Sequence, residues 1–133
     1  MRRSFLIAYM LVTVALPSTA APFIAHGGGD IRVYDLATDE HTNITNDPAS
    51  DLHPSWSGDG RTIAFVSDRG GVWHIYTMNA DGTDIRQRTR NDEGGTEPAV
   101  SPNGRYIAYT MHTGAEQRAR PIGLVDLRPG EVR

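Results

Sequence analysis

A fourteen-residue stretch occurs twice in this chain, with the two copies 44 positions apart. Residues 53–66 read HPSWSGDGRTIAFV, and residues 97–110 read EPAVSPNGRYIAYT. The identical positions are Pro54/Pro98, Ser57/Ser101, Gly60/Gly104, Arg61/Arg105, Ile63/Ile107 and Ala64/Ala108. About one match would arise by chance at ordinary residue frequencies. A fixed period of this length is typical of a repeat architecture, in which one small unit stacks on the next.

The middle repeat divides into four short strands separated by turn residues. We expect these strands at residues 55–57, 62–67, 73–79 and 85–89. The second and third are almost continuously apolar, which predicts a sheet covered on both faces. A four-stranded antiparallel unit that repeats and is covered on both faces is a β-propeller blade. The sequence therefore predicts an all-β fold, a partial β-propeller with a 44-residue repeat. The alternative, a β-sandwich, gives no reason for a constant offset.

Residues 1–20 have the pattern of a secretory signal peptide rather than of a blade. Arg2 and Arg3 form a positive segment, an apolar run follows, and residues 18–20 supply the small side chains of a cleavage site. The run is shorter than the roughly 20 residues of a transmembrane helix. The arginine pair also resembles the core of a twin-arginine signal, and either route exports the chain. We expect residues 21–133 to be periplasmic or secreted, with an uncleaved anchor as the alternative.

Composition and motifs narrow the classes of function. The net charge is −3, which gives no electrostatic case for binding nucleic acid, and we expect membrane contact only through the signal peptide. Cysteine is absent, which excludes disulfides, thiolate metal sites and a cysteine nucleophile. There is no Gly-x-Ser-x-Gly nucleophile elbow, no phosphate loop and no His-Glu-x-x-His zinc motif. We therefore expect no cofactor, no metal and no enzyme activity.

Residues 54–84, PSWSGDGRTIAFVSDRGGVWHIYTMNADGTD, resemble the WD-repeat-like blade of the TolB family of β-propellers. The matching residues are Pro54, Trp56, Ser57, Asp59, Gly60, Ile63, Ala64, Phe65, Ser67, Asp68, Arg69, Ile75, Tyr76, Asp81, Gly82 and Thr89. Two positions depart from the pattern. Gly58 replaces a usual proline, which the next repeat keeps as Pro102, and Arg88 stands where an apolar residue is usual.

The resemblance covers about two and a half blades, essentially all of residues 21–133. For TolB itself it implies a periplasmic, non-enzymatic protein of the Tol–Pal envelope system that binds partner proteins. We therefore expect a non-catalytic, extracytoplasmic interaction module with a protein partner in the cell envelope. The alternative is a fragment of a propeller-containing hydrolase or lyase whose catalytic part is not in this chain.

A binding surface is expected on the loops that follow the second and fourth strands, because these loops share one end of an up-and-down blade. The residues placed on this end are Asp51, His53, Arg69, Trp73 and Glu97. Segment 113–120 contains a three-residue insertion at the same end, and inserted loops often mark the binding face of a repeat protein. For Trp73, packing between blades is the alternative.

The number of blades predicts how the chain assembles. A blade hides both apolar faces only when it has a neighbour on each side, and the partial blades around residues 23–45 and 99–132 each lack one. Ile107, Ala108 and Tyr109 lie on or near the second uncovered face. Monomers rarely expose apolar patches larger than a few hundred Å². We therefore expect either self-association, in which copies complete a ring, or missing blades in a longer propeller.

Overall fold

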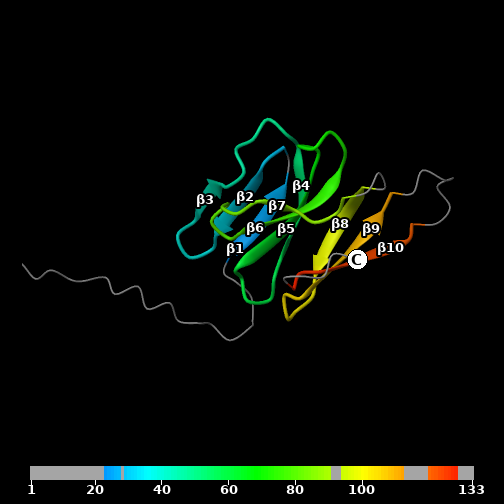
Figure 1. The fold of residues 1–133 in the computed structure, drawn as a ribbon. Helices are drawn as coiled ribbons and strands as arrows, with labels where there is room; N and C mark the ends of the chain where they lie inside the picture. Colours follow the sequence, from blue (N-terminus) through cyan, green and yellow to red (C-terminus); the bar gives the residue numbers. More distant parts are fainter. Residues whose placement is uncertain (1–22, 28, 91–93, 113–119, 129–133) are drawn as a thin grey trace, which may run out of the picture.

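The computed structural model describes residues 23–27, 29–90, 94–112 and 120–128. Within these residues the chain is all-β, with antiparallel strands in three sheets that stand side by side (Figure 1). The expected partial propeller is therefore confirmed. The predicted signal peptide and residues 113–119 of the inserted segment lie outside the described residues.

Each sheet is one blade, with strands that run up and down in the order of the sequence. Blade 1 contains β1 (Phe23–Gly27), β2 (Ile31–Asp35) and β3 (Glu40–Asn43). Blade 2 contains β4 (Asp51–Trp56), β5 (Thr62–Ser67), β6 (His74–Asn79) and β7 (Arg86–Gln87). Blade 3 contains β8 (Gly95–Val100), β9 (Tyr106–Met111) and β10 (Ile122–Asp126).

The repeated stretch has the same backbone in blades 2 and 3. After the first strand, the Ser57 and Ser101 amides donate at 2.8 Å to carbonyls five residues ahead, and each serine carbonyl accepts from a glycine amide. Gly60 and Gly104 both have φ of 68°, a conformation that glycine adopts without a steric penalty. The identical residues of the sequence repeat therefore mark the positions that shape this turn.

The strand limits in blade 2 differ from the expected ones at three places. The second strand lies at Thr62–Ser67 as predicted, but the first strand begins at Asp51, because a bulge between Leu52 and Ser55 hides its alternation. The third strand begins one residue late, at His74. The fourth is only Arg86–Gln87, because the Thr89 side chain, rather than a backbone carbonyl, accepts the next ladder bond.

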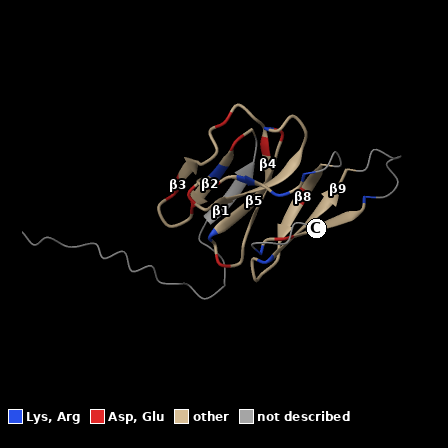
Figure 2. Cartoon of the chain, viewed as in Figure 1, with Lys and Arg blue, Asp and Glu red and all other residues tan. Residues whose placement is uncertain are grey.

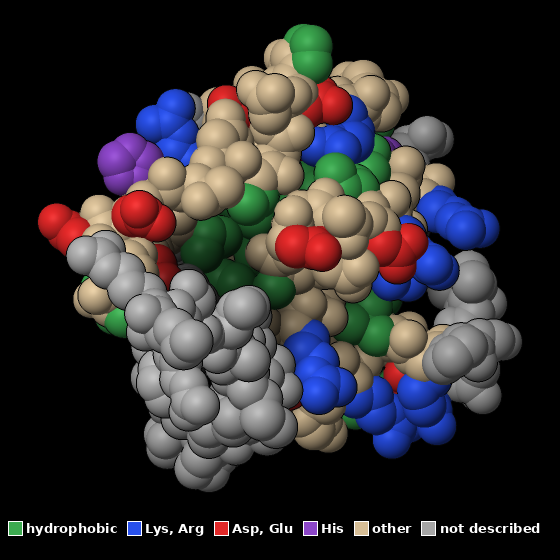
Figure 3. Space-filling view, turned by 90° about the vertical axis from the view of Figure 1, so that its left-hand side faces the viewer, with side chains coloured by type: hydrophobic (Ala, Val, Ile, Leu, Met, Phe, Trp, Pro, Cys, Tyr) green, Lys and Arg blue, Asp and Glu red, His purple; other side chains and the backbone are tan. Residues whose placement is uncertain are grey.

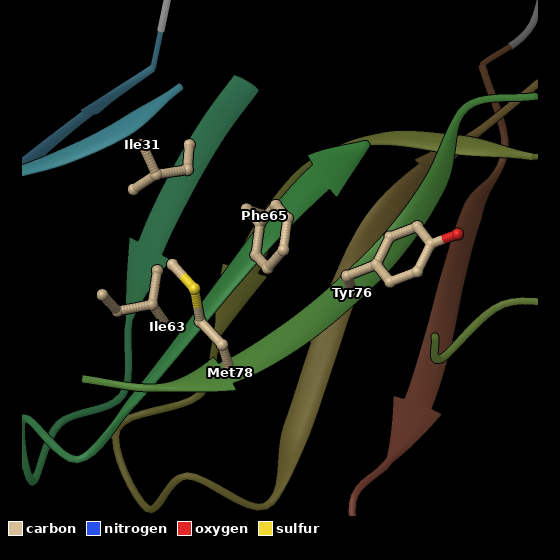
Figure 4. Close-up of a cluster of buried hydrophobic side chains, with 5 residues drawn as sticks. All are labelled: Ile31, Ile63, Phe65, Tyr76 and Met78. Atoms are coloured by element: carbon tan, nitrogen blue, oxygen red, sulfur yellow. The ribbon is translucent and has the colours of Figure 1, made fainter. Parts of the chain in front are cut away.

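Two apolar clusters fill the spaces between the blades. Between blades 1 and 2 lie Ile31, Ile63, Phe65, Tyr76 and Met78 (Figure 4). Between blades 2 and 3 lie Ala64, Val66, Ile75 and Ile107. Alternate residues of β5 thus contribute to both clusters, which explains its unbroken apolar sequence.

Charged side chains lie mainly on turns and at strand ends, while the central strands β5, β6 and β9 carry none (Figure 2). No helix in the described part of the chain is long and apolar enough to cross a bilayer. The strands without charge are the ones enclosed by their neighbours, as the stacking of blades requires.

Gly58 departs from the family pattern because the next repeat approaches it closely. A Cβ atom built on Gly58 would lie 2.2 Å from the carbonyl oxygen of Pro102. That oxygen belongs to the backbone and has little freedom to move. The turn of blade 3 therefore occupies the space that a proline ring would need in the turn of blade 2.

Candidate functional site

Two of the five predicted surface residues form a buried ion pair. Asp51 is fully buried, and Arg69 Nη2 lies 3.1 Å from both of its carboxylate oxygens. Arg69 Nε also donates to Ser67 Oγ at 2.9 Å. The predicted exposure of Asp51 is therefore wrong, because the carboxylate turns inward to satisfy a guanidinium that would otherwise be poorly compensated.

The same guanidinium covers two aromatic rings of blade 2. The Arg69 Cζ atom lies 5.4 Å from the ring centroid of Phe65 and 5.3 Å from that of Tyr76. These distances are within the range of cation–π attraction. Burial raises the pKa of the Tyr76 hydroxyl, while the charge of Arg69 opposes this shift. Arg69 thus joins β4, β5 and the rings beneath it, and holds the loop that follows β5 in place.

His53 and Glu97 lie at equivalent bulges in the first strands of blades 2 and 3. The bulge of β4 falls between Leu52 and Ser55, and that of β8 falls one repeat later. At these bulges His53 has φ of 50° and Glu97 has φ of 54°. Both precede a proline, which ordinarily favours an extended conformation. Strained backbone of this kind persists only where the surrounding structure imposes it, and it is frequent at functional sites.

The two bulges are presented by neighbouring strands. The Val100 amide of β8 donates to Ser55 Oγ of β4 at 3.1 Å, which ties the two first strands together just beyond the bulges. Both bulge residues are exposed. His53 and Glu97 therefore stand next to each other in the blade series, at the end of the blades that the sequence predicted.

Polar side chains of blade 3 extend this region. Thr110 Oγ1 donates to Glu97 Oε2 at 3.0 Å, and Thr96 Oγ1 lies 3.1 Å from His112 Nε2. We call the region the bulge surface, and it consists of His53, Thr96, Glu97, Thr110 and His112. Sequence reasoning missed three of these residues.

The two threonines could have been identified by aligning the two repeats. Thr96 and Thr110 occupy the positions of Leu52 and Val66 in blade 2, so two apolar positions have become polar around one bulge. An apolar-to-polar change beside a strained residue is the pattern expected when a surface, rather than a core, sets the residue type.

The family model described as the TolB beta propeller domain matches residues 18–131 of the chain. This chain belongs to the TolB β-propeller family. Its blades 1 to 3 are therefore TolB-type blades, and the resemblance noted in residues 54–84 extends to nearly the whole sequence.

Individual relatives agree with this assignment. The uncharacterized peptidase YuxL of Bacillus subtilis (strain 168) is 35% identical over 86 residues, which are 64% of this chain and 13% of that protein. The TolB homolog of Chlorobium luteolum is 31% identical over 106 residues, covering 77% of this chain and 24% of that protein. The crystal structure of TolB from Acinetobacter baumannii matches in fold with a TM-score of 0.67 and 22% identity, over 82% of this chain and 28% of that one. The chain spans less than a third of each of these proteins.

Trp73, the last of the five predicted residues, packs into the TolB-type core. Its partly buried ring lies against the cluster between blades 2 and 3, and its carbonyl accepts a hydrogen bond from the Gly95 amide at 2.9 Å. The alternative of packing between blades is confirmed. A binding role for His53 and Glu97 stays a prediction.

The bulge surface offers hydrogen bonding and charge rather than a metal cage. In the part of the chain that the structure describes, His, Asp and Glu side chains nowhere gather in threes as metal ligands. The surface combines a carboxylate, two imidazoles and two hydroxyls, which both donate and accept hydrogen bonds. Such a set suits recognition of polar groups on another macromolecule.

Proposed function

We propose that this chain is an extracytoplasmic protein-interaction module of the TolB type, and that it binds a protein partner of the cell envelope through the bulge surface. The observation that carries the proposal is the repeated bulge. Two successive blades present an exposed side chain from the same strained backbone position, yet one is His53 and the other is Glu97. A fixed backbone with differing side chains is well suited to specifying one partner among many.

Two independent features support this location. Residues 1–20 have the charge and hydrophobicity pattern of an export signal. The TolB resemblance adds the periplasm as the compartment in which such propellers act. N-terminal sequencing of the protein recovered from the periplasm tests this part, and we expect the first residue to be Ala21. A chain that retains Met1 would contradict cleavage.

The binding role is tested by capture from envelope extract with variants of the bulge surface. We expect the double variant His53→Ala, Glu97→Ala to lose the captured partner while keeping the β-sheet circular dichroism spectrum. The matched control is Asp84→Ala, Arg86→Ala, which removes an exposed ion pair elsewhere on blade 2. Equal capture by both double variants would contradict a role for the bulge surface.

A second function is favoured by one relative. The similarity to a protein named as a peptidase supports the alternative that these blades accompany a hydrolase. In that case the bulge surface would face a substrate on its way to a catalytic domain. A Gly-x-Ser-x-Gly segment encoded in the same gene would favour this alternative over the interaction module.

A further inference from the structure

One asparagine of this chain precedes a glycine. Asn103 is followed by Gly104, whereas the other asparagines precede isoleucine, aspartate or alanine. In an asparagine–glycine pair the backbone nitrogen of the glycine can attack the side-chain carbonyl carbon of the asparagine, because glycine has no Cβ atom to hinder the approach. Asn103 is exposed in the turn between β8 and β9, so water reaches it freely.

We propose that Asn103 is a site of spontaneous deamidation, and that the aspartate formed there keeps the hydrogen bonds of the asparagine, so that the turn of blade 3 becomes equivalent to the turn of blade 2. In the first step the Gly104 nitrogen bonds to Asn103 Cγ, and the side-chain amide leaves as ammonia with the proton that the glycine nitrogen gives up. Water then opens the resulting succinimide ring. Attack of water at Cγ gives aspartate, whereas attack at the backbone carbonyl carbon gives isoaspartate, in which the backbone runs through the former side chain.

Blade 2 already contains the proposed product at the equivalent position. Asp59 Oδ1 in blade 2 and Asn103 Oδ1 in blade 3 each accept a hydrogen bond at 2.7 Å from the serine hydroxyl two residues before. Each also accepts one at 3.1 Å from the backbone amide two residues after. These bonds use only the acceptor oxygen that aspartate and asparagine share. An aspartate at position 103 therefore fits the existing turn.

The same bonds make the aspartate a stable end product. The hydrogen bonds from the Ser57 hydroxyl and the Arg61 amide lower the pKa of Asp59, which keeps its carboxyl group ionised. A carboxylate is a poor target for a second attack by the glycine nitrogen. Isoaspartate, by contrast, inserts an additional backbone atom before Gly104, whose φ is 68° and whose amide donates to the Ser101 carbonyl at 2.8 Å. We expect only the aspartate to fit the turn.

The folded turn slows the reaction. The hydrogen of the attacking Gly104 nitrogen is bonded to the Ser101 carbonyl, and two donors hold the side-chain oxygen of Asn103. The Ser101 hydroxyl also accepts from the Tyr106 amide at 2.9 Å. The attack therefore requires the turn to open, and local openings of this kind cost less free energy than global unfolding.

The first test compares folded and unfolded protein. The purified chain, in the processed form that cells produce, is aged in mildly alkaline buffer with and without concentrated urea, and mass spectrometry measures conversion at Asn103. We expect conversion in both samples, at least about 10-fold slower without urea, which corresponds to an opening free energy of about 1.4 kcal/mol. No conversion in urea, conversion confined to urea, or equal rates in the two samples would overturn the proposal.

A variant of the turn tests the link between conversion and opening. Ser101→Ala removes the hydroxyl that bonds Asn103, so conversion without urea should accelerate by roughly 3- to 10-fold while the rate in urea stays the same. The matched control is Thr83→Ala, which removes a hydroxyl bonded to Asp81 Oδ1 at 2.6 Å, in a turn that packs against blade 1. The control should convert at the native rate. Equal rates for Ser101→Ala and the native chain, or equal acceleration by both variants, would contradict protection by the turn.

The new carboxyl group allows the products to be isolated. It adds one negative charge to a chain whose net charge is −3, so anion-exchange chromatography separates the products from the native chain. Acidic and basic side chains are intermixed on the side of blade 1 that Figure 3 shows. Retention therefore depends on the total charge rather than on one acidic patch at that side.

The stability of the two products tests the equivalence of the turns. Brief proteolysis of the isolated products should digest the isoaspartate form and spare the aspartate form. The variant Asn103→Asp should unfold within about 2 °C of the native chain. Equal digestion of the two forms, or a larger fall in the midpoint of Asn103→Asp, would refute the equivalence. None of these results bears on the bulge surface.

Discussion

Blades 2 and 3 have different side chains at equivalent positions of their central strands. In blade 2, Phe65 stacks on Tyr76 with ring centroids 5.8 Å apart, and Arg69 covers both rings. In blade 3 the position of Phe65 holds Tyr109, and the position of Tyr76 holds Gly123.

The tyrosine of blade 3 compensates for side chains that are missing around it. A Cβ atom built on Gly123 would lie 2.2 Å from the Tyr109 ring, and one built on Gly95 would lie 2.5 Å from it. Gly95 stands where blade 2 has Asp51. A single ring over two glycines thus replaces two rings and an ion pair. The two blades therefore share a backbone and leave no gap at this position, but the side chains that fill the space differ together.

The largest effect should come from breaking the buried ion pair of Asp51 and Arg69 in blade 2. Asp51→Ala removes the partner of a largely buried guanidinium and is expected to lower the free energy of unfolding by about 3–5 kcal/mol. Asp51→Asn keeps the side-chain volume, so its loss of stability should be smaller than that of Asp51→Ala. Enough of this variant should stay folded to be measured. Urea denaturation gives both values. The control Asp84→Ala, in an exposed pair, should change little. Equal losses for Asp51 and Asp84 would contradict a structural role for the buried pair.

The next largest effect should distinguish a buried position of blade 2 from the exposed equivalent position of blade 3. Ile75→Ala creates a cavity between blades 2 and 3 and is expected to cost about 2–4 kcal/mol. Ile122→Ala, at the equivalent strand position of blade 3, should stay within about 0.5 kcal/mol, because the Ile122 side chain is 77% exposed. Thermal unfolding of both variants compares them directly. A loss at Ile122 as large as that at Ile75 would mean that the Ile122 side chain is buried in solution.

The turns of the two blades should differ in how much stability they lose when glycine and proline are exchanged. Gly58→Pro restores the usual residue, but the Pro102 carbonyl occupies the required space, so we expect a loss of about 2–3 kcal/mol. Pro102→Gly, the reverse change in blade 3, should cost less than 1 kcal/mol, roughly the entropy of a freer unfolded chain. Chemical denaturation measures both. Stabilisation by Gly58→Pro would contradict the close approach of the two turns.

A smaller effect should reveal the coupling between Tyr109 and its glycines. Gly123→Ala forces the ring to move and is expected to cost about 1–2 kcal/mol. Tyr109→Leu shortens the side chain, so the double variant should lose less than the sum of the two single losses. A double-mutant cycle from urea denaturation gives this coupling. Strict additivity would mean that Tyr109 does not fill the space above Gly123.

The smallest effect concerns a carboxyl group, Asp59, that titrates in the turn of blade 2 and has no titrating equivalent in the turn of blade 3. Hydrogen bonds from Ser57 and from the Arg61 amide lower the pKa of Asp59, whereas the equivalent Asn103 makes the same bonds without titrating. A lowered pKa stabilises the fold above the ordinary carboxyl pKa, and this contribution is lost as the pH falls through the folded-state value. Asp59→Asn should therefore lose less stability than the native chain between pH 5 and pH 2, by less than about 1 kcal/mol because the group is exposed. Identical acid unfolding curves would exclude this contribution.

The sequence was sufficient for the parts of the fold that depend on local pattern. The second strand of blade 2 was predicted at its observed limits, because apolar residues on both faces give an unbroken run between two turns. The repeat offset then predicted equivalent strands in blade 3 without further information. The start of β4 was missed because a bulge at His53 interrupts alternation, and alternation is the only local signal of such a strand.

The candidate site was predicted in outline but not in its contacts. The end of the blades that carries His53 and Glu97 followed from counting strands. The burial of Asp51 did not, because its partner Arg69 lies 18 residues away and no local pattern indicates which charge turns inward. The fit of Gly58 to Pro102 likewise depends on how two repeats stack. The sequence pattern thus predicts structure within a repeat, but it does not predict the contacts between repeats.

The paired bulges have a consequence for protein engineering. At each bulge the backbone conformation is fixed by the strand, the following proline and the neighbouring blade, while His53 and Glu97 show that it accepts an imidazole or a carboxylate alike. Side chains at these positions can therefore be exchanged as separate units without redesigning the scaffold. A series of such blades is a rigid scaffold on which one exposed position per repeat can be varied to change which groups the surface presents.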